Sequence, residues 1–173
     1  SMDPHQGKET PAVEVTDQIF DTLLVVNPET NELEPQIAES WEQTSDTSYT
    51  FKIRQGIKFH DGSELTAEDV KFSLERAINS AAVSYVIDFV DSVEVVDPYT
   101  VIVNLKAPYA PALRNLSVPF TAIVPKAVVE ADEEAFRLHP IGSGPYKFVE
   151  WKQGDSVTLE GFDEYYAGAP ATK

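Results

Sequence analysis

The sequence predicts an α+β fold, with a mixed, mainly antiparallel sheet and flanking helices. Three observations predict it. Short runs that alternate apolar and polar residues come in pairs, amphipathic runs at helical spacing interrupt them, and no regular strand-helix-strand order connects them. At 173 residues, with 42% hydrophobic and 10% aromatic content, the chain is long enough to bury a substantial core.

The first regular element follows a polar, turn-rich start. Apolar residues such as Val15 and Ile19 recur at helical spacing, which predicts a helix over residues 12–24. Pro28 then breaks the pattern, and we expect residues 33–43 to form a short irregular or helical piece.

A half-buried strand is predicted next. In residues 49–54, aromatic and branched apolar side chains alternate with polar ones, which is the period-two pattern of a strand with one buried face. Gly56 permits a turn, after which the alternation resumes at Ile57 and Phe59.

Residues 65–78 predict an amphipathic helix. Thr66 stands three residues before Asp69, as in a capping box, and Val70 and Leu74 begin one apolar stripe. The predicted helix therefore follows directly after the turn at residues 60–62.

Further elements are predicted in the middle of the chain. Residues 91–105 hold two β-branched runs on either side of Pro98, which predicts a hairpin. Residues 110–118 and 125–138 have helical patterns, and Pro125 suits a first helical position.

A second hairpin is predicted near the end of the chain. Residues 146–151 and 156–161 read as strands that are joined through residues 153–155. Unpaired strand edges seek partners, so we expect self-association through these edges, or re-pairing of the hairpin within the chain.

Charge and composition exclude several classes of function. Thirteen basic residues against twenty-nine acidic ones give a net charge of −16, which repels nucleic acid and anionic membrane surfaces. The chain has no cysteine, which excludes disulfides, thiolate zinc sites and cysteine nucleophiles. No apolar run approaches the length of a membrane span, and the first residues given do not have the basic-then-apolar pattern of a leader.

His60 and Asp61 raise the question of an acid–base pair. Adjacent strand residues point to opposite faces, so the two side chains are expected to diverge. An active site would also need further groups that converge on them. With Gly62 supplying backbone freedom, the sequence favours structural roles in a turn for all three residues.

Ser143 is a second candidate because glycines flank it. Ile141 stands where the nucleophile elbow requires a glycine, so that motif is not met. The favoured interpretation is a turn at Gly142 and Gly144 that feeds the second hairpin, with Pro145 stiffening its exit.

An alternative of another class stays open at this point: a small hydrolase or metal enzyme that uses His60, Asp61 and Ser143. It requires a ring nitrogen of His60 to lie near Ser143 Oγ or near another histidine. The other histidines, His5 and His139, are distant in sequence and show no zinc-site spacing, so we assign no catalytic residue and no metal ligand.

Two aromatic residues are candidate ligand contacts. Tyr85 and Tyr109 lie in less regular stretches that we expect to reach the surface, whereas most other aromatics have core-like spacing.

Three long segments carry a family resemblance. They are EPQIAESWEQTSDTSYTFKIRQGIKFHDGSELTAEDVKFSLERA, VEVVDPYTVIVNLKAPYAP and PIGSGPYKFVEWKQGDSVTLEGFDEYYAGAP. In this order they resemble the peptide- and nickel-type solute-binding proteins that serve ABC importers. The family's strand-to-helix corner falls on His60, Asp61 and Gly62.

The resemblance implies a periplasmic-binding-protein-like fold. Family members are about three times this length and close two lobes on a ligand. Residues 31–138 would form the accessory α+β subdomain of the first lobe, and residues 1–30 a flank of its main part. Residues 139–173 would be a hairpin that returns, truncated, toward that main part. Ser1-Met2 is typical of a cloning remnant.

The resemblance also implies a function. The chain would be a fragment of an extracytoplasmic receptor, periplasmic or lipid-anchored, that captures oligopeptides or dipeptides for an ABC importer. Nickel-, haem- or sugar-type receptors of the same family are the alternatives. The implied partners are a peptide and the importer's membrane subunits, with no cofactor. Tyr85 lies near a tyrosine that some oligopeptide-binding members turn toward the cleft, and Gly142, Gly144 and Pro145 match the family pattern with a structural role.

Overall fold

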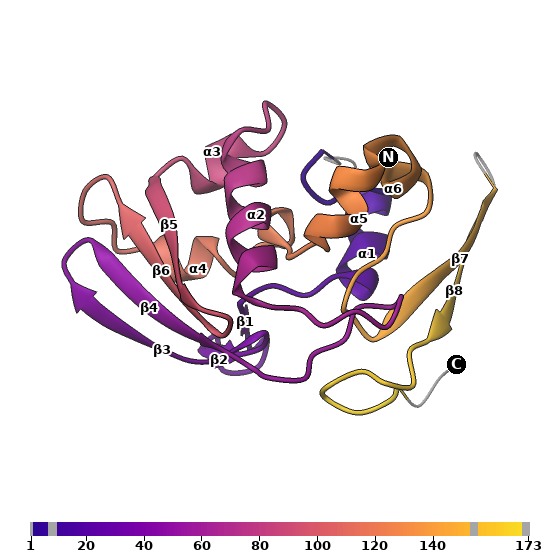
Figure 1. Ribbon diagram of the computed structural model, residues 1–173, viewed down its shortest axis with the longest axis horizontal. Helices are drawn as coiled ribbons and strands as arrows, with labels where there is room; N and C mark the ends of the chain where they lie inside the picture. Colours follow the sequence, from indigo (N-terminus) through magenta and orange to yellow (C-terminus); the bar gives the residue numbers. More distant parts are fainter. Residues whose placement is uncertain (1, 7–9, 153–155, 171–173) are drawn as a thin grey trace.

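A four-stranded antiparallel sheet forms one end of the molecule in the computed structural model, which describes residues 2–6, 10–152 and 156–170 (Figure 1). The strands are β3 (Ala38–Ser45), β4 (Ser48–Ile53), β5 (Val90–Asp97) and β6 (Thr100–Leu105). Their order is β3-β4-β6-β5, so the predicted hairpin of residues 91–105 is confirmed as β5 and β6.

One amphipathic helix covers this sheet. Helix α2 (Ala67–Ile78) packs on β5 and β6 and buries Val70, Leu74 and Ala77, which confirms the predicted helix and its apolar stripe. The buried side chains of the sheet alternate along β4 and β6, as the period-two pattern requires.

Asp69 connects the start of α2 to a second helix. Its Oδ2 accepts a hydrogen bond of 2.9 Å from the backbone N–H of Thr66 and fixes the first turn of α2. Its Oδ1 accepts one of 2.9 Å from the backbone N–H of Lys126, the first residue of α5 (Lys126–Ala131). Burial raises the pKa of Asp69, while these two bonds act in the opposite direction.

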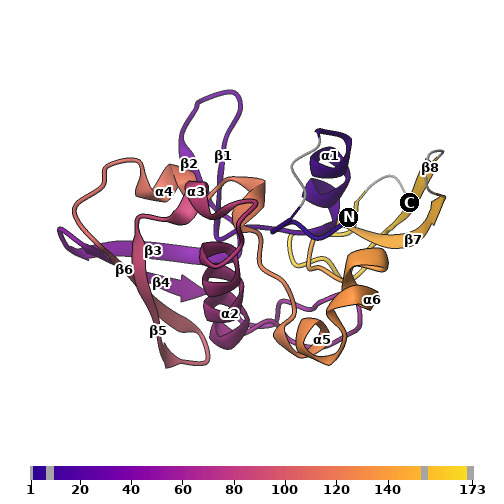
Figure 2. The same ribbon diagram turned by 90° about the horizontal axis from the view of Figure 1, so that it is seen from above.

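A second hydrophobic cluster lies at the other end of the molecule (Figure 2). It joins α1 (Thr10–Ile19), α5, α6 (Glu133–Leu138) and the hairpin of β7 (Tyr146–Lys152) and β8 (Ser156–Gly161). Its buried members are Ile19, Phe20, Ala122, Val124, Val129 and Phe136.

Short elements connect these two regions. Strands β1 (Leu24–Val26) and β2 (Leu33–Pro35) form a two-stranded sheet that projects from the molecule in Figure 2. The other short elements are α3 (Ser84–Ile87), α4 (Ala112–Asn115) and the 3-10 turn η1 (Pro119–Thr121).

The segment with the two glycines closes against the end of α1. The backbone N–H of Gly144 donates a hydrogen bond of 2.8 Å to the carbonyl of Ile19, one of the carbonyls that a helix end leaves without an intrahelical partner. A Cβ at Gly142 would lie 2.2 Å from that oxygen, and one at Gly144 would lie 2.6 Å from the Ile19 carbonyl carbon. Only glycine fits at either position.

The prediction for residues 33–43 was wrong. These residues form β2 and most of β3, with no helix. Most β3 side chains are exposed, so its sequence lacks the alternation that would have identified a strand.

Three other boundaries differ from the prediction. Helix α1 ends at Ile19, not at residue 24, and the chain then runs into β1. Residues 125–138 form two helices, because Asp132 accepts a 3.0 Å bond from Ala135 N and caps the second one. Beyond Gly56 the strand does not resume as a ladder, and only an isolated bridge pairs Lys58 with Glu64.

The predicted turn over residues 153–155 lies outside the described residues, whereas its two strands are confirmed. The division into residues 1–30, 31–138 and 139–173 stays a prediction. None of the helices among the described residues combines the length and the apolar character needed to cross a membrane.

The hairpin edges generate a first test. Among the described residues β7 and β8 pair only with each other, and Val149 on β7 is exposed. We expect the chain to self-associate with rising concentration in sedimentation experiments. Because a charged side chain blunts an edge strand, Val149→Lys should weaken association about tenfold, whereas Leu138→Lys on α6 should not. A strictly monomeric chain at all concentrations would contradict this expectation.

The glycine contact generates a second test. Gly142→Ala should lower the free energy of unfolding by on the order of 3 kcal/mol, because its Cβ would overlap the Ile19 carbonyl. Gly62→Ala is the control, since its φ of 90° strains alanine by only about 1–2 kcal/mol and no atom lies near its Cβ. Urea unfolding measures both, and equal losses would contradict the proposed close contact.

Candidate functional site

His60 connects the strand-to-helix corner to residues 142–144, the glycine segment, by hydrogen bonds. Its backbone N–H donates to Gly142 O at 2.9 Å. Gly142 N–H donates to Nδ1 of its ring at 3.3 Å, so the ring proton is on Nε2, which donates to Gly144 O at 3.0 Å. The ring also stacks edge-on against Phe162, with 4.7 Å between the ring centroids.

Burial keeps His60 neutral. Burial lowers its pKa to about 4, and Lys147 acts in the same direction, whereas the bond to Gly144 and the charge of Asp61 oppose the shift. Nδ1 accepts a backbone N–H and Nε2 donates to a backbone carbonyl, so the ring is neutral near neutral pH.

Asp61 turns away from His60. Its side chain is exposed, and Oδ1 accepts hydrogen bonds from the backbone N–H and the hydroxyl of Ser63, at 3.0 and 2.6 Å. Gly62 follows with a φ of 90°, in the region that favours glycine. Asp61 and His60 thus bond different partners, and no hydrogen bond joins their side chains as a catalytic pair would require.

Ser143 does not join His60 either. It is fully buried, and its Oγ has no hydrogen-bond partner among the described residues. The nucleophile–base pair that a hydrolase would need is therefore not formed. Nor, within the described ranges, are three histidine, aspartate or glutamate side chains grouped so that they could hold a metal ion.

The two candidate tyrosines lie on separate elements. Tyr85 belongs to α3 and is 61% exposed. Tyr109 follows β6, is 38% exposed and packs its ring 4.8 Å from that of Phe89. Together with Tyr49 it lines an open hollow of about 570 Å³.

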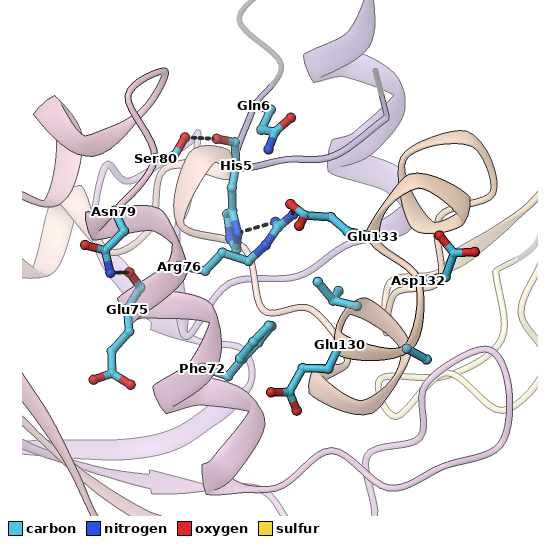
Figure 3. Close-up of a pocket in the computed structure, with 12 residues that line it drawn as sticks. His5, Gln6, Phe72, Glu75, Arg76, Asn79, Ser80, Glu130, Asp132 and Glu133 are labelled. Carbon is cyan, nitrogen blue, oxygen red and sulfur yellow. Dashed lines mark hydrogen bonds and ion pairs between the residues drawn. The ribbon is translucent and has the colours of Figure 1, made fainter.

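A groove of about 610 Å³ lies between α2, α5 and the N-terminal segment (Figure 3). Its polar centre is Arg76. The guanidinium Nη1 lies 2.7 Å from Asp3 Oδ1, while Nη2 bonds Asp3 Oδ2 and lies 2.9 Å from Glu133 Oε1. Asp3 is fully buried, so its charge depends on this pairing.

His5 completes the network at the groove. Its Nε2 donates to Ala122 O at 2.8 Å. Its Nδ1 accepts from Arg76 Nη1 at 2.9 Å, as Figure 3 shows. Burial lowers the pKa of His5 to about 4, Asp3 raises it and Arg76 lowers it. Ser80 Oγ adds a 2.5 Å bond to the carbonyl of His5 and ties the N-terminal segment to α2.

The lining of this groove favours a cationic or amphipathic group. Phe72 and Val129 are apolar, Glu75 of α2 and Glu130 of α5 are among the lining residues, and Arg76 is already paired. An anion would meet carboxylates there without a free cation to hold it.

A buried carboxylate marks a third region. The hydroxyls of Tyr165 and Tyr166 both donate to Asp21 Oδ2, at 2.8 and 2.5 Å. Burial raises the pKa of Asp21 to about 6, the two hydroxyl bonds lower it, and Asp17 raises it. Burial, followed by the charge of Asp21, also raises the pKa of both tyrosines.

A small hollow lies beside these tyrosines. It has a volume of about 230 Å³ and contains the half-buried side chain of Arg54. Arg54 Nε donates to the carbonyl of Gln36 at 2.6 Å, and its guanidinium lies over the Tyr166 ring, 5.9 Å from the centroid. We call this region the Arg54 hollow; it is lined by Val25, Pro35, Gln36, Arg54, Tyr165, Tyr166 and Ala167.

Sequence reasoning did not find the last three regions. Asp3 and Arg76 are 73 positions apart, and Asp21 and Tyr165 are 144 apart, so no local spacing links them. The adjacent tyrosines Tyr165 and Tyr166 were a signal that could have led to the Asp21 cluster.

A family model matches most of the chain. Residues 32–173 match the model described as bacterial extracellular solute-binding proteins, family 5 Middle. A curated relative, the glutathione-binding protein GsiB of Pectobacterium atrosepticum, is 34% identical over 175 aligned residues. The match covers 98% of this chain and 34% of that protein, so the chain spans about a third of the length of the curated relatives it matches.

Solved structures also match nearly the whole of this chain and little more than a third of their own length. MoaA from Agrobacterium tumefaciens R10, in complex with mannopinic acid, superposes with a TM-score of 0.93 at 31% identity over 100% of this chain and 37% of its own. DppA from Helicobacter pylori, in complex with the peptide STSA, superposes with a TM-score of 0.85 at 31% identity over 96% of this chain and 38% of its own. The predicted α+β, periplasmic-binding-protein-like fold is thereby confirmed.

The neutral histidines generate a prediction for pH. Below about pH 6.5 the unfolded chain protonates His5 and His60, whereas the folded chain does so only near pH 4. The free energy of unfolding should therefore fall as the pH falls through this window. Asp21, with its raised pKa, opposes the fall below about pH 6.

His60→Gln should make the fall between pH 7.5 and 5.0 shallower by on the order of 1–3 kcal/mol, measured by urea unfolding at each pH. His139→Gln, at an exposed histidine, is the matched control and should leave the difference unchanged. An equally steep fall in His60→Gln would show that His60 binds its proton in the folded state as readily as in the unfolded chain.

Proposed function

Since the chain belongs to the bacterial extracellular solute-binding proteins of family 5, we propose that it forms part of a receptor that captures a short peptide and delivers it to an ABC importer. The observation that carries the proposal is the continuous match: 98% of the chain aligns with a glutathione-binding protein at 34% identity. A family of extracellular proteins implies capture outside the cytoplasmic membrane.

The class of ligand is inferred from relatives. Glutathione and the peptide STSA, named for GsiB and DppA, are both short peptides. Mannopinic acid, named for MoaA, shows that the same fold also serves other carboxylic acids. We therefore propose a short peptide as the solute, with nickel-, haem- and sugar-type ligands as the alternatives within the family.

In this proposal the chain supplies one wall of the binding cleft. Receptors of this kind bury the ligand between two lobes, and closure of the lobes is the state that the importer recognises. The chain spans about a third of its relatives, and its hollows are open at the surface. One wall alone cannot surround a peptide.

We propose no catalytic step for the chain. The two groups that a hydrolase would pair, His60 and Ser143, share no hydrogen bond: His60 bonds glycine backbone through both ring nitrogens, and Ser143 Oγ has no partner among the described residues. The exposed Tyr85 and the half-exposed Tyr109 stay proposed ligand contacts.

Calorimetry tests the proposal. The 173-residue chain alone should give no measurable heat with glutathione or with mixed di- to octapeptides at micromolar concentrations. A chimera in which this chain replaces the matching third of the Pectobacterium protein should bind glutathione, because the other lobe is restored. Micromolar binding by the chain alone would contradict the one-wall proposal, and a folded chimera that binds neither glutathione nor peptides would contradict the receptor function.

A further inference from the structure

Two side chains in the Arg54 hollow, Gln36 and Arg54, carry hydrogen-bond donors. Gln36 is the first of them. Its Oε1 accepts a 2.9 Å bond from the backbone N–H of Thr22, and since a backbone amide can only donate, the atom that faces Thr22 must be the oxygen. The Gln36 amide nitrogen therefore points the other way, and no acceptor among the described residues takes its protons.

Arg54 is the second donor. A guanidinium carries five N–H groups, and Arg54 uses the one on Nε for the carbonyl of Gln36. Its two terminal nitrogens bond no carboxylate and no carbonyl within the described ranges. Arg54 lines the hollow together with Tyr166. Its guanidinium lies over the ring of Tyr166, and this cation–π contact favours one orientation of the guanidinium.

The other residues that line the hollow carry no carboxylate. The hydroxyls of Tyr165 and Tyr166 both donate to Asp21, and the ring of Tyr166 lies against the Arg54 guanidinium. Val25 and Pro35 are apolar. A planar fork of N–H groups, with an amide N–H beside it and apolar walls around it, matches the chemistry of a carboxylate that ends a short carbon chain.

We propose that the Arg54 hollow is a subsite for a carboxylate group of the solute, held by the terminal nitrogens of Arg54 and by the amide nitrogen of Gln36. The proposal rests on the receptor function and deepens it, because it names the part of the ligand that this wall takes. At about 230 Å³ the hollow is smaller than pockets that enclose whole ligands, so it admits one end of a peptide.

The hollow can be tested in the chain as it stands, by NMR of the side-chain N–H signals of Arg54 and Gln36. Acetate and triglycine should each shift both signals to saturation at millimolar concentrations. Triglycine amide, which lacks the carboxylate, and sodium chloride at equal ionic strength should not. Tighter binding of triglycine than of acetate assigns the site to a peptide terminus, and equal binding assigns it to simple carboxylates.

Gln36→Glu is the sharpest variant. Its Oε1 still accepts from Thr22, while the donor is replaced by a negative charge, so acetate binding should weaken at least tenfold. Arg54→Lys keeps the charge but loses the fork and should weaken binding as well. Arg137→Gln, at an exposed ion pair on α6, is the matched control and should stay within twofold.

Equal shifts by triglycine and its amide, or unchanged acetate binding in Gln36→Glu, would overturn the subsite. These outcomes are independent of the receptor proposal, because the titration reads local binding of a small anion. If the hollow ignores acetate while the GsiB chimera still captures glutathione, only the subsite is wrong. If the hollow binds acetate while the chimera captures nothing, the receptor function is wrong.

Discussion

The arrangement of the chain depends on one hydrogen bond, which the carbonyl of Ile19 accepts from the backbone N–H of Gly144. This carbonyl ends α1, and it is satisfied by the backbone of Gly144, which can approach only because neither Gly142 nor Gly144 has a side chain. His60 then bonds the same two glycines from the strand-to-helix corner. A helix end, a corner and the entry to β7 are thus joined at one point, and each fixes the position of the other two.

A second network of hydrogen bonds surrounds the buried carboxylate of Asp3, which pairs with Arg76 of α2. Asp3 is enclosed in protein despite the net charge of −16, because the guanidinium of Arg76 neutralises it in a two-pronged pair. His5 adapts by staying neutral, and it joins Arg76 to the carbonyl of Ala122. Such satisfied networks favour one fixed arrangement of the side chains that form them.

Sequence patterns identified the elements whose side chains alternate between core and solvent. Helix α2 and strand β6 have that alternation, and two β-branched runs on either side of Pro98 identified the β5–β6 hairpin. Strand β3 is exposed along most of its length and carries no such pattern, so it was missed. The family segments located the glycines and the corner. They could not locate the contacts of Asp21 or Arg76, because long-range packing brings those partners together.

Because hydrogen bonds link the corner, the glycine segment and α1, we expect these three parts to unfold as one cooperative unit with the sheet. Native-state amide hydrogen exchange measures this most directly, through the amides of His60 and Gly144 against that of Phe51 in β4. If the account is right, His60 and Gly144 exchange only through the global unfolding that exposes Phe51, with the same dependence on urea. Exchange of His60 and Gly144 at a much lower free energy than Phe51 would contradict it.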